Sequence, residues 1–312
     1  MRIRPTAVVL ALALATLAGC GDDAEPTSSG TETGRQQASR SSNNVPTEET
    51  QEGVAPAPST VTSAPGLASS GPGQVTVPVY FVGSTPQGKR LFREFQRVSG
   101  DDPLLAAADA MTAGDALDPD YGTLFPGGSF ASVTEEPGAI VVEVADDGWS
   151  TRAAGMSRRE ARLAAQQLVY TVQGVAQSRL PVRVEAGGEP VPLFGIDTAG
   201  GLRNAGPDGV LAFVNVTTPE QGATVGSPLV ASGVANSFEA NVPWEIRDGS
   251  GAVVKRGFTT AEGWGNKLYP WRTKINVSKL PAGDYTFVAM TDDPSGGEGG
   301  GPTEDSKDVT IG

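Results

Sequence analysis

The chain has 312 residues, with 23 basic and 36 acidic side chains, a formal charge of −13, one cysteine and no histidine. The absence of histidine excludes Ser-His-Asp and Cys-His mechanisms and any metal site built on imidazole. A single cysteine excludes an internal disulfide and a thiolate zinc cluster, and the acidic excess argues against nucleic acid or anionic lipid as a partner.

The N-terminal segment has the order of charges and apolar residues that is typical of a secretory signal. Arg2 and Arg4 precede a short apolar run, which ends in Leu17-Ala-Gly-Cys20, the pattern of a bacterial lipobox. This pattern predicts a signal peptide over residues 1–19, cleavage before Cys20, and acylation of its thiol, as by palmitate. A plain secretory peptide and a transmembrane helix are the alternatives, although the apolar run is short for a bilayer span. We expect an extracytoplasmic protein held at the cell membrane by this lipid.

Residues 20–73 contain no aromatic side chain, and Ser, Thr, Pro, Gly, Glu, Gln and Asn dominate them. Such a segment cannot bury enough apolar surface to offset the entropy of ordering. The composition therefore predicts a disordered linker that tethers the folded part to the membrane, with a typical reach of about 40 Å. Its Ser and Thr residues with interspersed Pro could also carry sugars.

Strand and helix signals alternate over residues 75–202. Asp102 caps a first helix with Pro103 in its first turn, and the capping box Ser157-Arg-Arg-Glu160 begins a longer second helix. Residues 89–98 fit either a helical stripe or a strand. Strands are expected at 75–82, 130–134, 139–145 and 181–186. These elements predict an α+β domain in which two helices cover one face of a largely antiparallel sheet.

Residues 210–312 show no helical stripe and a strand signal about every 8 to 12 residues, which predicts an all-β immunoglobulin-like sandwich. Trp244 lies where such sandwiches often keep a core tryptophan, and Tyr285 with Phe287 resembles a tyrosine corner in which Phe287 replaces the second cysteine. The expected strands are 210–216, 229–234, 241–247, 252–259, 272–277, 285–291 and 307–311.

Two sets of motifs carry a family resemblance. The segments VYFV, DPLLAAADAMTAGD and ARLAAQQLVYTV followed by VRVEAGGEPV resemble the GerMN domain of sporulation and spore-germination proteins and of actinobacterial lipoproteins. The segments VNVTTPEQGATVG, GWG and LPAGDYTF resemble the immunoglobulin-like domain of bacterial spore-germination proteins. The order lipobox, linker, GerMN domain and immunoglobulin-like domain is itself known in this group.

The resemblance implies a role in binding and assembly and no catalytic constellation. GerMN folds are similar to the ring-building modules of secretion-type assemblies, which pack against neighbours. One related actinobacterial arrangement acts beside a membrane sensor kinase. The implied partners are therefore envelope or membrane proteins.

The acidic residues allow two kinds of chemistry. Paired carboxylates such as Asp146-Asp147 could serve glycoside hydrolysis, although Asp at turns and helix caps explains most of the pairs. Asp292, Asp293 and Glu298 crowd a glycine-rich loop with oxygen ligands and form a candidate calcium site, the alternative being a solvated acidic loop. No other cofactor is implied.

Trp264, Tyr269 and Trp271 form the densest aromatic cluster of the sequence. Aromatic faces on a sandwich loop could anchor a partner protein or stack on sugars. The alternative is that Trp271 enters the core as its strand begins and Trp264 packs under a loop.

Together these observations predict a non-catalytic, lipid-anchored envelope protein that binds partner proteins at the outer face of the cytoplasmic membrane, as scaffold or accessory of an assembly or sensor of the sporulation or germination type. The alternative function is a module that binds cell-wall glycan such as peptidoglycan, or, more remotely, a carboxylate glycoside hydrolase.

Overall fold

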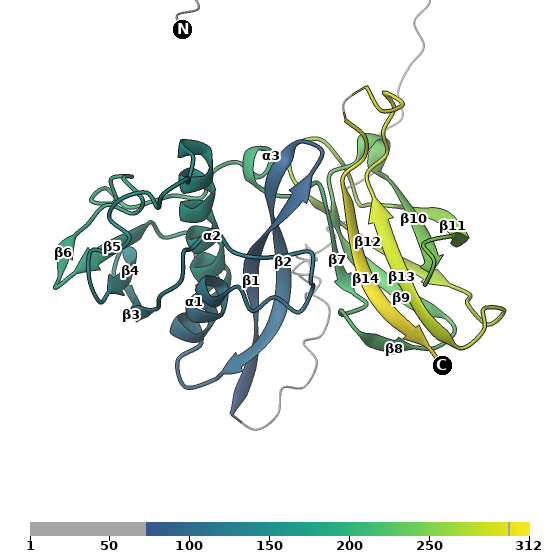
Figure 1. Cartoon of the computed structure of the whole chain (residues 1–312), viewed down its shortest axis with the longest axis horizontal. Coiled ribbons are helices and arrows are strands. Elements are labelled where there is room, and N and C mark those ends of the chain that lie inside the picture. Colours follow the sequence, from purple (N-terminus) through teal and green to yellow (C-terminus); the bar gives the residue numbers. More distant parts are fainter. Residues whose placement is uncertain (1–72, 299) are drawn as a thin grey trace, which may run out of the picture. The chain divides into compact units, whose positions relative to one another are not determined.

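The computed structural model describes residues 73–298 and 300–312 (Figure 1). All of them belong to one compact unit. The predicted signal peptide, the lipidation of Cys20 and most of the predicted linker lie outside the described residues. None of the helices in the described ranges has the length and hydropathy that a bilayer span requires.

The first two strands form a long hairpin. β1 (Gln74–Thr85) pairs antiparallel with β2 (Gly88–Ser99), from Gln74 opposite Ser99 to Thr85 opposite Gly88. Alternate residues of β1 are buried, which is the period of a strand with one face on a core. The ambiguous segment 89–98 is therefore a strand, because its apolar residues pair with β1 along their whole length.

The remaining strands of the first domain form a second sheet, with the order β3-β4-β5-β6. Its strands are β3 (Phe130–Glu136), β4 (Ala139–Val144), β5 (Val182–Ala186) and the short β6 (Glu189–Pro190). The α+β class is confirmed, and the strand pairing is largely antiparallel as predicted, but the strands form two sheets instead of one. The one parallel pair of these two sheets is β4 and β5. A long helix connects these two strands, and such a crossover returns the chain in the same direction.

The two helices are α1 (Pro103–Ala113) and α2 (Arg158–Ala176), and both begin at the predicted caps. In Figure 1 they lie between the β1–β2 hairpin and the four-stranded sheet. Phe81 of β1, Met111 of α1, Leu168 of α2 and Ile140 of β4 belong to the same buried cluster. The helices therefore have core on both sides, whereas the sequence predicted helices on one face of one sheet.

The second domain is a sandwich of two sheets, β11-β10-β13-β14-β8 and β12-β9-β7, entered through the one-turn α3 (Pro207–Val210). The immunoglobulin-like class is confirmed. The short β8 was not predicted, because its three-residue sequence ATV is too short to show a strand pattern. The elements are β7 (Val214–Thr218), β8 (Ala223–Val225), β9 (Leu229–Ala235), the 3-10 turn η1 (Phe238–Ala240), β10 (Asn241–Asp248), β11 (Val253–Thr260), β12 (Tyr269–Ile275), β13 (Gly283–Met290) and β14 (Glu304–Ile311).

Aromatic side chains fill the centre of this sandwich. Trp244, Trp271 and Phe287 are buried in one cluster between the two sheets. The Tyr285 hydroxyl donates to the Pro281 carbonyl at 2.9 Å, which is the hydrogen bond of a tyrosine corner. Packing of these rings takes the place of the disulfide that many immunoglobulin-like domains carry.

Candidate functional site

A buried charged cluster connects the first domain to β14. Lys307 faces inward on β14, in line with the core residues Val309 and Ile311. Its ammonium group forms an ion pair with Asp118 of the loop after α1, and a second one with Asp305 at 3.1 Å. It also contacts Tyr121, donating to the hydroxyl at 2.9 Å and lying 4.5 Å from the ring centre.

The carboxylates of this cluster have further partners. Asp305 accepts hydrogen bonds from the Tyr121 hydroxyl at 2.5 Å and from the Asn215 amide of β7 at 3.0 Å. The backbone N–H of Asp118 donates to Glu94 of β2 at 3.0 Å. Loop 115–121, β2, β7 and β14 therefore meet in one hydrogen-bonded network, which is the favourable arrangement for buried polar groups.

Burial and charge together shift the pKa values of these groups. Burial alone would lower the pKa of Lys307, but Asp305 and Asp118 outweigh it and the pKa is raised. Burial, reinforced by Asp305, raises the pKa of Tyr121 well above its ordinary value of 10.0. Burial also raises the pKa of Asp118, against the opposing effect of Lys307. At neutral pH the lysine is charged and the tyrosine is a neutral donor, and both are already engaged.

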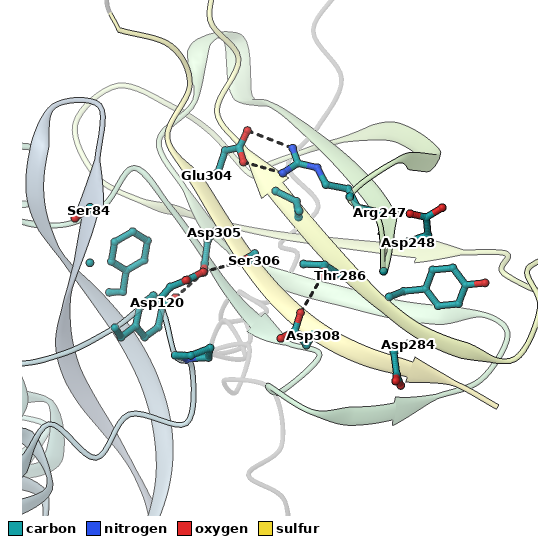
Figure 2. A pocket seen from close by; sticks show the side chains of 18 residues that line it. Ser84, Asp120, Arg247, Asp248, Asp284, Thr286, Glu304, Asp305, Ser306 and Asp308 are labelled. Atoms are coloured by element: carbon teal, nitrogen blue, oxygen red, sulfur yellow. Dashed lines mark hydrogen bonds and ion pairs between the residues drawn. The ribbon is translucent and has the colours of Figure 1, made fainter.

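A groove of about 1120 Å³ adjoins this cluster, and Tyr121 and Asp305 contribute to its wall (Figure 2). One side is the outer face of β13 and β14 with the turn between β10 and β11, and the other side comes from the β1–β2 hairpin and residues 119–121. Its lining residues include a single basic side chain, Arg247, and the carboxylates Asp120, Asp248, Asp284, Glu304, Asp305 and Asp308.

The one cation of the groove is already neutralised. Arg247 forms hydrogen bonds with Glu245 at 2.9 Å and with both carboxylate oxygens of Glu304 at 3.3 and 3.4 Å. Burial opposes the charge, but these carboxylates outweigh it and raise the pKa of Arg247. The groove is therefore acidic over the rest of its lining.

The predicted aromatic cluster is divided between core and surface. Trp271 is 3% exposed and lies in the sandwich core, so it presents no face to a partner, contrary to its prediction as a binding residue. Tyr269 is half-buried, and its hydroxyl donates to Asn266 at 2.9 Å. Trp264 is 52% exposed and forms an edge-to-face pair with Phe238, which is 41% exposed, at a ring distance of 5.3 Å.

This exposed aromatic pair has a defined support. The side chain of Asn236 donates to the Gly265 carbonyl at 3.2 Å and accepts from the Gly265 N–H at 2.8 Å. These bonds join the loop before η1, which carries Phe238, to the loop that carries Trp264. The pair is thus held by two loops tied together rather than by one mobile tip. No sequence pattern indicates Phe238 as part of this pair, because its partner Trp264 lies far along the chain.

The three predicted calcium ligands are not brought together. Asp292 accepts from the Asn241 amide at 3.1 Å, Asp293 closes a turn by accepting from the Ser295 N–H at 3.1 Å, and Glu298 is exposed. Within residues 73–298 and 300–312 no three acidic, histidine or cysteine side chains gather as a metal site. The calcium prediction is therefore not supported, because local turns occupy the carboxylates.

The other acidic pairs of the sequence have local structural roles. Asp102 caps α1, and Asp146 accepts from the Gly148 N–H at 2.8 Å in a turn. Asp118 and Asp120 are the exceptions, because they reach the buried cluster and the groove. One feature of the sequence indicates this cluster: Lys307 occupies an inward position of a strand whose polar and apolar residues otherwise alternate.

Family models match both domains. Residues 78–192 match the family described as sporulation and spore germination, and residues 213–298 match the immunoglobulin-like domain of bacterial spore germination. The protein joins a GerMN domain to an immunoglobulin-like domain of the spore-germination type. Both families belong to sporulation or germination, which agrees with a non-catalytic accessory role, and neither description names a reaction. No curated protein matches the chain significantly.

Several solved structures are similar to parts of the chain. The tandem GerMN domains of the sporulation protein GerM from Bacillus subtilis share 10% identity over 66% of this chain and 63% of theirs, with a TM-score of 0.35. A tetra-tandem repeat from the extending region of a large adhesion protein shares 22% over 32% of this chain and 24% of its own, with a TM-score of 0.24. CopC from Methylosinus trichosporium OB3b shares 17% over 32% of this chain and 91% of its own, with a TM-score of 0.22. The chain thus spans less than two thirds of the first two structures, and scores this low carry no argument about function.

Proposed function

We propose that the protein is a non-catalytic, lipid-anchored accessory of a cell-envelope assembly or sensor, tethered by Cys20 at the outer face of the cytoplasmic membrane, where it binds partner proteins. The lipobox pattern supports the anchoring, and the two germination-type domains support the accessory role. The buried cluster around Lys307 joins the two domains. It supports a single body whose binding surfaces keep fixed positions relative to one another.

The observation that carries the binding role is the exposed pair of Phe238 and Trp264. Large aromatic side chains are usually mostly buried, whereas these two are 41% and 52% exposed on loops tied together by Asn236. Exposed aromatic residues on a rigid support anchor partners at low entropic cost. We therefore assign partner binding to this edge of the sandwich.

In-cell crosslinking of the membrane-bound protein, followed by mass spectrometry, tests this proposal. A membrane or envelope protein should be captured from the wild type, and its capture should fall with Cys20→Ala and with the double variant Phe238→Ser/Trp264→Ser. Leu117→Ser, which removes a similarly exposed apolar side chain from the GerMN domain, should leave capture unchanged. Equal capture by the double variant and the wild type would refute the assignment of the binding edge.

The same aromatic pair favours one second candidate, a module that binds cell-wall glycan, because exposed aromatic rings also stack on sugars. Pelleting with purified peptidoglycan separates the two functions. Co-sedimentation that is lost in Phe238→Ser/Trp264→Ser, without capture of any protein, would replace protein binding by glycan binding.

A further inference from the structure

The outer face of the five-stranded sheet carries exposed side chains on β11, β13 and β14. Residues directly opposite each other on antiparallel strands share a face. Trp244 and Phe287 point into the core, so Glu245 of β10, Thr286 of β13 and Asp308 of β14 face outward. Figure 2 shows this face with its row of polar side chains.

At its β14 side the face is acidic and lies in the groove. Asp284, Glu304 and Asp308 are exposed there. Arg247 pairs with Glu304, but among the described residues no basic side chain forms an ion pair with Asp284 or Asp308. Their hydrogen bonds are with hydroxyls and an amide, from Thr310 at 2.8 Å to Asp284 and from Thr286 at 2.9 Å and Gln221 at 3.0 Å to Asp308. These negative charges are left without a cation.

At its β11 edge the same face carries two exposed apolar side chains, with the exposed Arg256 between them, opposite Glu245. Phe258 lies opposite Pro243, and Val253 lies opposite Arg247, so both point outward. Phe258 is 71% exposed and Val253 is 45% exposed. An edge strand that exposes large apolar side chains is one that proteins usually protect, so its persistence here marks a surface that a partner covers. This sheet face therefore presents both carboxylates and apolar side chains to solvent.

We propose that this outer sheet face is a docking surface for a basic, partly apolar segment of a partner protein. Lysine or arginine side chains of the segment meet Asp284, Glu304 and Asp308, while an apolar side chain covers Phe258. The groove, at about 1120 Å³, exceeds the range of about 300 to 1,000 Å³ of small-molecule pockets, which suits a peptide. The surface uses residues other than the Phe238 and Trp264 pair, so it stands or falls independently of that binding edge.

Charge excludes the nearest alternative occupant, the chain's own N-terminal segment. Residues 20–72 contain two basic residues against seven acidic ones, so the segment and the groove repel each other. The basic residues of the segment are Arg35 and Arg40, and the acidic ones are Asp22, Asp23, Glu25, Glu32, Glu48, Glu49 and Glu52. A second copy, with a net charge of −13, is disfavoured for the same reason.

The test is binding of a fluorescein-labelled ten-residue peptide of alternating lysine and valine to the full-length protein in detergent, followed by fluorescence anisotropy. The variant Asp284→Asn/Glu304→Gln/Asp308→Asn should weaken binding about tenfold at low salt, with less effect at high salt. Phe258→Ser should weaken binding about threefold, with no change in salt dependence. A peptide with glutamate in place of lysine should not bind.

The matched control removes the same number of negative charges from exposed positions of the GerMN domain. Glu135→Gln/Asp147→Asn/Glu189→Gln should change the affinity less than about twofold. Equal weakening by the two triple variants would refute the proposal, since it would show attraction by net charge alone. A dimer in light scattering that Phe258→Ser abolishes would also overturn it, in favour of a second copy. Circular dichroism of each variant confirms that the fold is retained.

Discussion

Among the residues that the structure describes, Lys307 has the most unusual surroundings. A lysine at an inward position of a core strand is tolerated only with close counter-charges, and Asp118 and Asp305 provide them. Removal of one partner leaves a buried charge incompletely compensated, whereas replacement of a whole pair by apolar residues costs little. The network therefore specifies which surfaces meet more than it adds stability.

Asp118→Asn should lower the free energy of unfolding by about 3 kcal/mol, because Lys307 stays buried with only Asp305 as counter-charge. Urea unfolding followed by circular dichroism measures the loss. The triple variant Asp118→Leu/Asp305→Asn/Lys307→Met, which removes the lysine together with both of its carboxylate partners, should recover most of it. A triple variant as unstable as the single one would show that shape, rather than charge compensation, decides stability at this position.

Gly233 is the residue at which two sheet partners approach too closely for any side chain. A Cβ atom there would lie 2.0 Å from the backbone oxygen of Asn215 and 2.9 Å from the ring of Trp271. Gly233→Ala should therefore force β7 and β9 apart and cost about 3 kcal/mol of stability. Thermal unfolding provides the measurement. Gly226→Ala, where a Cβ would meet no atom within 4 Å, is the control and should be neutral.

Among the elements, α2 has the most complete set of stabilising contacts at its start. The Ser157 side chain accepts from the Glu160 N–H, and the Glu160 carboxylate accepts from the Ser157 N–H. Lys89 of β2 adds an ion pair to the same carboxylate at 2.7 Å. The capping box was readable from sequence because its residues are three apart, whereas the ion pair with a residue of another element was not.

Acid should weaken this helix start. The hydrogen bond from Lys89, followed by those from Ser157, lowers the pKa of Glu160 from its ordinary value of 4.5 to about 2. Since the folded pKa is depressed, the contribution of Glu160 to stability is fully present above pH 4.5 and is lost as pH falls toward 2. Unfolding measured across that range should show a shallower loss in Glu160→Gln. The control Glu189→Gln, at an exposed position, should show the same pH dependence of unfolding as the wild type. A Glu160→Gln variant with the same pH dependence as the wild type would contradict the prediction.

At the element scale, local signals explain what the sequence could predict. Alternating burial, helix caps and the tyrosine corner at Tyr285 depend on residues that are close in sequence, and each was predicted. The parallel β4–β5 pair, the short β8 and the cluster around Lys307 depend on which distant segments meet. For the aromatic cluster the sequence left exposure and burial open, and the structure exposes Trp264 but buries Trp271 in the sandwich core.

At the scale of the whole molecule, the contact between the two domains depends on the protonation of the buried cluster, so it should weaken at alkaline pH. The pKa values of Lys307 and Tyr121 are raised above the ordinary 10.5 and 10.0. The folded state therefore holds these protons more tightly than the unfolded chain does. Their contribution is fully present below pH 10.0 and is lost as pH rises through the folded values.

Urea unfolding between about pH 8 and pH 11 should show a falling midpoint in the wild type and the separation of one transition into two, because the domains lose their common network before they lose their own cores. Tyr121→Phe/Lys307→Met should remove most of this dependence. A wild type that keeps a single, pH-independent transition throughout that range would show that the other contacts between the domains suffice.

The sequence separation of the buried pair also sets an order of events in biosynthesis. Asp118 and Lys307 are 189 positions apart, and Tyr121 and Asp305 are 184 apart. At a synthesis rate of about 5 to 20 residues per second, the loop that carries Asp118 waits about 10 to 40 s for its counter-ion to be made. The contact between the GerMN domain and the sandwich therefore cannot form until β14 has been made. A chain cut short before β14 lacks the counter-ion that the buried position of Asp118 requires.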